Sequence, residues 1–516
     1  MSSIVENMSS ETVETRKSLK NRGICVLIPT YNNAGTIVDV VRRSLEQCDD
    51  VIVVCDGCTD DTVSLLEGIE PDSVSGKKPD LVVLPKNSGK GAALRAGFRH
   101  ALSRGFSYAI TLDGDGQHFP EDIPLMLKAN REHPGALIVG ARKDLDKADR
   151  SGASKFANRF SNFWFALQTG HYLCDTQTGY RLYPLKKLGG LSLLTSRYEA
   201  ELELMVFASW RGVPLVNQSV NVYYPPREER VSHFRPARDF GRISLLNAGL
   251  CFLSVVYGYP RCILRGTATF LRTLYSLLFA VVNMMLIMTP LSYLYLSMGK
   301  MTEKKKYNIH RMLNFMARFL LYRHGIPGAK YSESNPEGED FKKPAVIICN
   351  HQSHLDIVTI LSRTPKMIVV TAGWVWKNPL YSYVIHNAEF MPATEGMETM
   401  MPKLRSLVER GYSIAIFPEG TRSPDCRIGR FHQGAFHIAK ELHLDIVPMI
   451  LYGAGKVLPK HGKSMHKWPI HIEIDRRITP EELSRMGETT LAQTTAMRHY
   501  YIKRYNEIAD KIEHDI

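Results

Sequence analysis

Short apolar runs alternate with helical stretches along the first half of the chain. The runs at 24–28, 51–54, 81–84, 108–112 and 137–140 have the composition of strands, and helical spacing follows most of them. Strands that alternate with helices predict a mostly parallel α/β sheet between residues 23 and 222. Ligands of such sheets bind beyond the carboxyl ends of the strands, where the polar clusters of this sequence lie.

A second α/β pattern starts at residue 344, with strands predicted at 345–349, 367–370, 413–417 and 445–451. An amphipathic helix is expected over 303–325, and a polar loop over 331–343. The predicted organisation is an α/β protein with a polar tail at 1–20, a first domain at 21–242, a membrane-associated segment at 243–300 and a second domain at 301–516. A length of 516 residues agrees with two domains, because single cores stop growing well below it.

The composition changes abruptly in the segment between the two patterns. Two uncharged apolar runs, 245–257 and 274–296, are separated by arginines, and the second is long enough to enter a bilayer. Cations flank this second run on both sides, so the positive-inside rule selects no single direction of crossing. Two spans, or a re-entrant hairpin bent near Pro290, would leave both domains in the cytoplasm, and we favour this arrangement over one full crossing. A buried core helix of a soluble protein is the alternative.

The charge of the chain favours anionic partners. Lys and Arg number 65 against 52 Asp and Glu, a formal net charge of +13, which suits nucleotides, lipid phosphates or a membrane surface. Nucleic acid is not predicted, because zinc-finger spacing, RNP-like strings and base-reading basic helices are all missing. The nine scattered cysteines indicate a reducing compartment, and the CxxC pair Cys55 and Cys58 has no second pair to complete a zinc site. The first twenty residues lack the apolar core of a secretory signal, so the N-terminus is expected in the cytoplasm.

Three predicted strand ends of the first domain carry acidic and polar residues. The segments VLIPTYNNAGTI (26–37), VCDGCTDDT (54–62) and TLDGDGQH (111–118) each run from a strand into a polar loop. Asp113 and Asp115, spaced i and i+2, are hard oxygen ligands that suit Mg²⁺ or Mn²⁺ beside a nucleotide diphosphate. Taken alone, such a pair also fits two solvated loop acids.

Taken in order, these segments resemble the family-two inverting glycosyltransferases of the GT-A fold over about 24–243. NSGKGAALRAGF (87–98), DTQTGYRLYP (175–184) and RVSHFRPARDF (230–240) extend the resemblance, which points to the dolichyl-phosphate or polyprenyl-phosphate sugar transferases. The resemblance implies a nucleotide-sugar donor, Mg²⁺ or Mn²⁺ as cofactor, and a lipid or polyprenyl-phosphate acceptor.

The same resemblance implies roles for individual side chains. The nucleotide-sugar would be bound, from base to sugar, by Pro29, Tyr31, Asp56, Lys90, Asp113 and Gln117. The metal would be held by Asp113 and Asp115, and phosphates would be clamped by Arg150 or Arg181 with the segment 230–235.

The acceptor decides whether the first domain needs a general base. A hydroxyl acceptor requires one, and Glu201 or Asp175 could supply it, whereas a phosphate acceptor is already ionised near neutral pH. A helix that carries Glu199, Glu201 and Glu203 fits a solvated or structural face equally well.

Two predicted strand ends of the second domain carry residues for acyl transfer. In ICNHQSHLD (348–356), four residues separate His351 from Asp356, so the carboxylate can orient the imidazole as a general base. In IFPEGTRS (416–423), Gly420 permits a tight turn and Arg422 offers a fork for phosphate or carboxylate. His354 is interpreted as a helix cap or a surface residue.

With IVPMILYG (446–453), these motifs closely resemble the lysophosphatidate and glycerol-phosphate acyltransferases over about 307–478. The resemblance implies that His351 takes the proton of an acceptor hydroxyl that attacks an acyl thioester of CoA or acyl carrier protein, while Asp356 holds the tautomer. The acceptor would be seated by Glu419, Gly420, Thr421 and Arg422. The chain departs from the family at FMPATEG (390–396), where an Ile-Asp-Arg segment and its phosphate-binding arginine are missing.

The sequence therefore predicts a bifunctional transferase of bacterial envelope lipid or glycolipid biosynthesis. Both catalytic domains are expected on the cytoplasmic side of the inner membrane. The alternative is a membrane scaffold or lipid-binding protein with one degenerate catalytic domain, against which the intact Asp113–Asp115 and His351–Asp356 pairs weigh.

Overall fold

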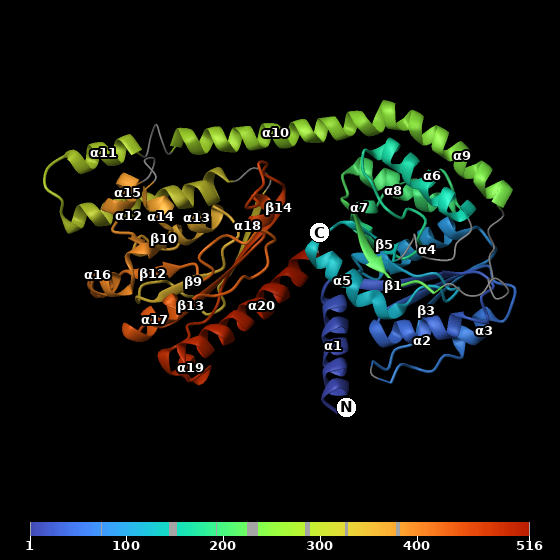
Figure 1. Ribbon diagram of the computed structural model, residues 1–516, viewed down its shortest axis with the longest axis horizontal. Coiled ribbons are helices and arrows are strands. Elements are labelled where there is room, and N and C mark those ends of the chain that lie inside the picture. The colour runs from blue at the N-terminus through green and yellow to red at the C-terminus, as the bar shows by residue number, and fades with distance from the viewer. Residues whose placement is uncertain are drawn as a thin grey trace. The chain divides into compact units, whose positions relative to one another are not determined.

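The computed structural model describes residues 2–73, 75–143, 152–191, 193–223, 236–283, 289–325, 329–377 and 382–514. The chain forms two compact units, Met1–Arg265 with Asp510–Ile516, and Gly266–Ala509. Each unit is built on one seven-stranded, predominantly parallel sheet (Figure 1), so the predicted α/β fold class is confirmed. The division between the units falls inside the segment 243–300.

The sheet of the first unit has the order β3-β2-β1-β4-β6-β5-β7, and β6 alone among these strands runs antiparallel to its neighbours. Its strands are β1 Ile24–Thr30, β2 Val51–Asp56, β3 Asp80–Leu84, β4 Tyr108–Thr111, β5 Leu137–Arg142, β6 Arg181–Pro184 and β7 Leu215–Val220. Its helices are α1 Ser2–Asn21, α2 Ile37–Gln47, α3 Thr62–Glu67, α4 Lys90–Ser103, α5 Ile123–Glu132, α6 Gly152–Thr169, α7 Leu185–Leu188, α8 Glu199–Arg211 and α9 Pro236–Leu253. All five strands predicted for this half are present.

Helices cover both faces of this sheet, which explains why its strands are continuously apolar. Along β1, Ile24, Val26 and Ile28 pack with α2, α3 and α5 on one face. Cys25 and Leu27 point to the other face and pack with α4, α7 and α8. Figure 1 shows α2 and α3 on one side of the sheet and α4, α7 and α8 on the other.

A helix replaces the polar tail that the sequence predicted for residues 1–20. The guanidinium of Arg16 in α1 is 7% exposed and donates hydrogen bonds to the carbonyl oxygens of Leu45 and Glu46 at the end of α2. These carbonyls have no partner within their own helix, so the arginine satisfies groups that would otherwise need water. Arg16 of α1 is therefore held by specific contacts rather than by water.

The end of the chain is part of the first unit. Arg22, directly after α1, is fully buried and forms ion pairs with Asp510 and Glu513 near the end of helix α20. Ser18 of α1 donates to the same Asp510 at 2.9 Å. One buried cation thus holds two buried carboxylates that lie almost 500 residues later in the sequence.

The sheet of the second unit has the order β11-β10-β12-β9-β13-β14-β8, with β13 and β14 antiparallel and the other neighbours parallel. Its strands are β8 Ala329–Ser334, β9 Val346–Cys349, β10 Met367–Thr371, β11 Met391–Pro392, β12 Ser413–Ile416, β13 Ile446–Tyr452 and β14 Trp468–Ile474. Its helices are α11 Thr289–Ser297, α12 Glu303–Arg318, α13 Leu355–Leu361, α14 Gly373–Lys377, α15 Ser382–Asn387, α16 Met397–Glu409, α17 Gly434–Glu441, α18 Ala454–Val457, α19 Pro480–Arg485 and α20 Thr490–His514, which ends in the first unit.

One predicted loop of the second unit is wrong. The polar segment 331–343 was expected to be irregular, but its first residues belong to β8, which pairs in parallel with β14 from Ala329 to Ser334. Ala329, Tyr331 and Ser334 of β8 are partly buried and its other three residues are exposed, so this edge strand is mostly solvated. The predicted amphipathic helix at 303–325 is present as α12, followed by a π-helical turn at Phe319–His324.

A long apolar helix occupies the segment that joins the two units in sequence. The helical stretch Gly241–Ala280 runs from within α9 through a π-helical turn into α10 (Tyr259–Val281). Of its 18 most apolar consecutive residues, 28% are buried. Among the described residues it alone is long and apolar enough to cross a membrane. The second run predicted from the sequence, 274–296, is divided in its described part between α10 and α11. Pro290 lies in the first turn of α11, where proline is tolerated.

We expect Arg22→Met to destabilise the first unit selectively, because it leaves two buried carboxylates without a cation. Breaking a buried ion pair on one side costs about 3–5 kcal/mol. Hydrogen exchange of the full chain should show loss of protection in β1 and β4, with β9 and β13 unchanged. Arg43→Met, which breaks a half-exposed pair with Glu121, should change protection little. Equal protection in both variants would contradict this account.

Candidate active sites

Three parallel strands of the first unit end at the same edge of the sheet. β1 lies between β2 and β4, so the loops after these strands meet where the strand order reverses. Asn32, with a positive φ of 52°, accepts from the backbone N–H of Thr59 at 2.8 Å. Thr36 donates to the carbonyl oxygen of Gly114 at 2.6 Å. Side-chain hydrogen bonds therefore bring the three predicted polar loops together.

Asp56, at the end of β2, orders the loop that precedes α4. The carboxylate is 3% exposed and accepts from the backbone N–H groups of Ser88 and Gly89 at 2.9 and 2.7 Å. Because α4 begins at Lys90, these bonds fix the position of the lysine. The carboxylate that was expected to bind the nucleoside therefore accepts two backbone hydrogen bonds in this structure.

Lys90 joins two acidic groups of the site. Its ammonium lies 2.6 Å from Asp113 Oδ1 and 3.1 Å from Glu201 Oε2. Burial lowers the pKa of Lys90, but the two carboxylates outweigh it and hold the pKa above its usual value. The lysine stays charged at neutral pH and lies within reach of groups bound at Asp113.

The two aspartates of the Asp-x-Asp motif have different environments. Burial opposes ionisation of Asp113, but Lys90 and His118 lower its pKa to about 2. Burial and the charge of Asp113 raise the pKa of Asp115 to about 6. Two crowded carboxylates with one lysine favour a further cation.

The backbone packs closely against the first aspartate of this pair. Gly179 faces Asp113, and a Cβ atom at Gly179 would lie 2.4 Å from Asp113 Oδ2. Within the described ranges no third His, Cys, Asp or Glu completes a metal cluster. The chain therefore offers two carboxylates, and the remaining ligands would come from phosphate oxygens or water, as is common for Mg²⁺.

Both expected general bases of the first unit are held in ion pairs. Asp175 is fully buried, with Arg142 Nε at 2.5 Å and Asn158 at 2.9 Å. Burial raises its pKa, but Arg142 outweighs this and lowers the pKa below its usual value. Glu201 pairs with Lys90 and lies 3.6 Å from the buried Arg181. Neither carboxylate is placed as a free base.

The other residues expected at this site differ in how accessible they are to a ligand. Pro29 is buried inside β1, whereas Tyr31 and Gln117 lie half-buried in the loops. Arg181 is 1% exposed and donates hydrogen bonds to Tyr183 and to backbone carbonyl oxygens. Its role in this structure is therefore to hold neighbouring segments in place. Arg150 and the segment 230–235 lie outside the described residues.

In the second unit, His351 and Asp356 form the expected pair at the end of β9. His351 Nδ1 lies 2.9 Å from Asp356 Oδ2, and that oxygen also accepts the backbone N–H groups of Gln352 and Ser353. Asp356 is fully buried. The ring of Phe417 stacks on the imidazole at 4.0 Å between centroids. The carboxylate therefore selects the tautomer with a proton on Nδ1, which leaves the Nε2 lone pair for a substrate proton.

Glu419 links the two predicted motifs of this site. Its carboxylate is 6% exposed and accepts the backbone N–H of His351 at 2.8 Å and that of Gly429 at 2.9 Å. Burial raises the pKa of Glu419. Both oxygens are engaged by the backbone, so the geometry gives Glu419 a positioning role that spacing alone did not reveal.

The remaining residues of the second motif line the loop after β12. Gly420 has a φ of +66°, which favours glycine, and the exposed Thr421 accepts from Lys460 at 3.2 Å. Arg422 is half-buried and makes no side-chain hydrogen bond to the described residues. Burial and the nearby charge of Arg422 lower the pKa of His354. Arg422 therefore remains available to an anionic group.

Known families match both units. A model of "Glycosyl transferase family 2" matches residues 25–189, and a model of "Acyltransferase" matches residues 328–452. An undecaprenyl-phosphate mannosyltransferase of Micrococcus luteus is 30% identical over 181 residues, which are 33% of this chain and 70% of that protein. The UDP-N-acetylglucosamine–dolichyl-phosphate N-acetylglucosaminyltransferase of Methanococcus voltae is 29% identical over 199 residues, 36% of this chain and 79% of that protein.

The second unit has relatives of a different kind. A chloroplastic 1-acyl-sn-glycerol-3-phosphate acyltransferase of Arabidopsis thaliana is 33% identical over 142 residues, 25% of this chain. The matched part spans 40% of the length of that plant protein. The predicted fusion of a family-two glycosyltransferase with a glycerolipid-type acyltransferase is confirmed by these matches.

The double hydrogen bond of Glu419 predicts the behaviour of Glu419→Gln. An amide oxygen accepts only one of the two N–H groups, and an unsatisfied buried group costs about 1–3 kcal/mol. We expect faster amide exchange at His351 and Gly429 and a roughly 10- to 100-fold lower acyl-transfer kcat. Glu395→Gln, at a partly exposed ion pair with Lys403, is the matched control. A normal kcat with only a raised acceptor KM would show instead that Glu419 contacts the acceptor.

Proposed function

Because the chain belongs to glycosyl transferase family 2 in its first unit and to the acyltransferase family in its second, we propose that it adds a sugar and an acyl group to one membrane lipid or lipid precursor. The observation that carries this proposal is the presence of two intact strand-end sites in one chain, Lys90–Asp113–Asp115 and His351–Asp356. A shared lipid pathway accounts for their fusion, and we place that pathway in bacterial envelope lipid or glycolipid biosynthesis.

For the first unit we propose a nucleotide-sugar donor that binds over the ends of β1, β2 and β4. Asp113 and Asp115 would hold Mg²⁺ or Mn²⁺, which supplies positive charge to the leaving diphosphate. Lys90 lies beside Asp113 and adds a fixed cation in the same place. Transfer would proceed as one displacement by the acceptor oxygen, with inversion at the sugar carbon.

The acceptor of the first unit is proposed to be a lipid phosphate. Asp175 is locked to Arg142, and Glu201 is shared between Lys90 and Arg181, so a hydroxyl acceptor would find neither expected base free. A phosphate oxygen is already ionised at neutral pH and needs no base. The names of the Micrococcus and Methanococcus relatives, which contain undecaprenyl phosphate and dolichyl phosphate, support this choice.

For the second unit we propose transfer from an acyl thioester of CoA or acyl carrier protein to a lipid hydroxyl. The hydroxyl oxygen attacks the thioester carbonyl while His351 Nε2 accepts the hydroxyl proton. The C–S bond then breaks, and the thiolate takes up the proton. Arg422 would bind an anionic group of the acceptor. Glu419 would hold the loop that carries His351 against the loop that carries Gly429.

The apolar helix Gly241–Ala280 supports attachment to a membrane. Large side chains of α9 and α10 are exposed, among them Leu245 at 77%, Phe252 at 68% and Leu264 at 70%. Contiguous exposed apolar surface of this kind marks contact with lipid or protein. We propose that both catalytic units work at the cytoplasmic face of the inner membrane.

The two activities should separate by mutation, which tests the proposed function. Asp115→Ala, or EDTA, should abolish sugar transfer from UDP- and GDP-sugars to polyprenyl phosphate and leave acyl transfer from oleoyl-CoA to lysophosphatidate intact. His351→Ala should lower acyl-transfer kcat at least about 100-fold, as loss of a general base does, and spare sugar transfer. Asp61→Ala and His354→Ala are the matched controls. If the folded wild type showed neither activity with any donor, the scaffold alternative would replace this proposal.

Membrane attachment through the apolar helix predicts a salt-resistant association. The chain should sediment with membranes and stay there at high salt, because salt screens charges but does not weaken apolar burial. A variant with Leu245, Phe252 and Leu264 changed to Gln should move to the soluble fraction. Recovery of the wild type in the soluble fraction at low salt would contradict the proposal.

A further inference from the structure

Helix α6 of the first unit has polar side chains on its buried face and aromatic side chains on its exposed face. Phe156, Phe163 and Leu167 are 62%, 60% and 49% exposed. Phe160 and Trp164 are partly exposed between them, and neighbouring rings lie 5.5 to 5.9 Å apart between centroids. We call these five residues the aromatic face. A helix normally turns its apolar side to the core, so this face indicates a partner outside the unit.

The buried face of α6 holds the loop between α6 and β6. Asn162 donates to the carbonyl oxygen of Cys174 at 2.8 Å and accepts from the backbone N–H of Thr176 at 3.1 Å. Asn158, one turn earlier, donates to Asp175 at 2.9 Å. Both asparagine side chains are buried. Three consecutive residues of the α6–β6 loop therefore take their positions from this helix.

The α6–β6 loop ends beside the carboxylates of the Asp-x-Asp motif. Gly179 of this loop packs against Asp113, and its carbonyl oxygen accepts from Thr111 Oγ1 at 2.7 Å. The buried Arg181 donates to the carbonyl oxygen of Thr176 at 3.0 Å. A displacement of α6 would therefore move backbone that lies next to Asp113, where we propose that the donor diphosphate binds.

Helix α6 also packs against α9, to which we assign contact with the membrane. Gln168 donates to Asn247 Oδ1 at 3.0 Å, and both side chains are buried. Figure 1 shows the two helices with α8 on one side of the sheet. In the parts of α6 and α9 whose side chains are described, the charged residues are Arg159 and Arg242, and neither part has an acidic residue. Two neighbouring helices with exposed apolar residues and positive charge suit an anionic lipid surface.

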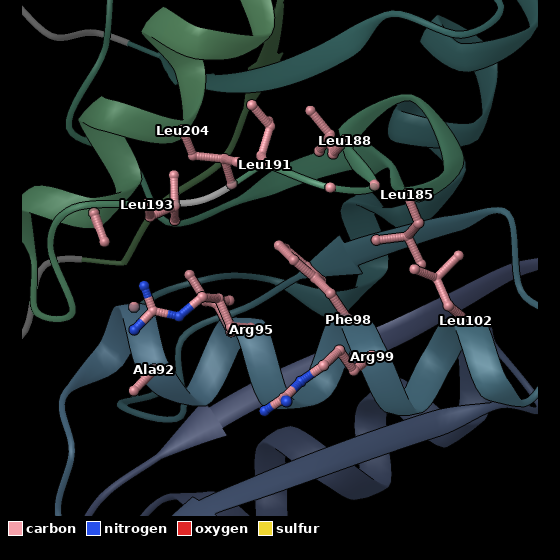
Figure 2. Close-up of a pocket in the computed structure, with 15 residues that line it drawn as sticks. Ala92, Arg95, Phe98, Arg99, Leu102, Leu185, Leu188, Leu191, Leu193 and Leu204 are labelled. Carbon is pink, nitrogen blue, oxygen red and sulfur yellow. The ribbon is translucent and has the colours of Figure 1, made fainter.

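The aromatic face is separate from the apolar pocket of this unit. That pocket lies between α4, α7 and α8 (Figure 2), and none of its described lining residues belongs to α6 or α9. Small molecules bind in concave sites, whereas an exposed strip of bulky rings fits an extended partner. Aromatic side chains concentrate at the boundary between the water and the hydrocarbon of a membrane. Because α6 adjoins α9, a lipid bilayer is the partner that fits this strip.

We propose that the aromatic face of α6 enters the headgroup region of an anionic membrane and that this contact holds the α6–β6 loop in place for sugar transfer. The exposed face of the helix binds lipid, and its buried face orders the backbone beside Asp113. Membrane contact therefore raises the rate of sugar transfer itself, in addition to anchoring the chain. The effect on rate rests on the glycosyl transfer proposed for this unit, whereas the lipid contact does not.

Photolabelling tests the lipid contact independently of activity. The full chain is reconstituted in vesicles of phosphatidylethanolamine and phosphatidylglycerol that contain a phosphatidylcholine with a diazirine near the carboxyl end of its acyl chain. Labelled peptides are mapped by mass spectrometry. We expect labels on residues 156–167 as well as on α9. Labels on α9 without labels on α6, or cross-links from α6 to a second copy of the chain, would overturn the proposal.

A pair of substitutions removes the aromatic face. Phe156→Glu with Phe163→Glu should lower labelling of α6 about tenfold, because two carboxylates oppose entry into an anionic interface. Leu65→Glu with Val83→Glu is the matched control. These two side chains are exposed on α3 and β3 of the same unit, and this pair should label like the wild type. Equal loss of labelling in both pairs would mean that added charge alone, and not the aromatic face, decides the contact.

The same variants test the effect on rate. Sugar transfer is measured in these vesicles with a short, water-soluble polyprenyl phosphate, so that entry of the acceptor into the bilayer does not limit the rate. Phe156→Glu with Phe163→Glu should lower kcat about tenfold, because the α6–β6 loop is ordered in a smaller fraction of molecules. Amide exchange at Thr176 should become faster, and acyl transfer should stay unchanged.

The possible failures are distinguishable. A normal kcat in the variant that has lost α6 labelling would overturn the effect of lipid contact on sugar transfer. Absence of sugar transfer in the wild type with every donor would overturn the proposed function and this effect together. The labelling of α6 would still decide whether the aromatic face contacts lipid.

Discussion

Both sites depend on buried carboxylates that accept hydrogen bonds from backbone amides. Asp56 orders the loop before α4, Asp356 orders the turn after His351, and Glu419 joins two loops of the second unit. A buried carboxylate without such partners would lose several kcal/mol of solvation, so each loop and its acid stabilise one another. These bonds fix the positions of Lys90 and His351, to which we assign roles in the proposed reactions.

Continuous apolar strands were predictable, whereas elements stabilised by distant partners were not. β1, β2, β9 and β13 are buried on both faces, and their local composition is sufficient to identify them. β8 is a polar edge strand that exists because β14 pairs with it. α1 was interpreted as a tail because its stabilising partners, the end of α2 and the end of the chain, are far away in sequence.

The sequence motifs predicted one contact of the candidate sites but not the hydrogen-bond partners of their other carboxylates. The predicted contact between His351 and Asp356 could be inferred from local spacing and was found. The partners of Asp175, Glu201 and Glu419 come from other elements, and no spacing rule specifies them. A carboxylate near a strand end can therefore act as a base, bind a ligand or hold a loop in place, and its hydrogen-bond partners indicate which.

The ion pairs of Arg22 have a consequence for biosynthesis. Glu513 follows Arg22 by 491 residues, so Asp510 and Glu513 leave the ribosome long after the arginine does. At elongation rates of about 5–20 residues per second, roughly 25–100 s pass between synthesis of the cation and synthesis of its partners. The nascent first unit must wait with an unpaired arginine through this interval. A chain that ends before Asp510 lacks both partners of Arg22, so these ion pairs form only in molecules that already contain the second unit.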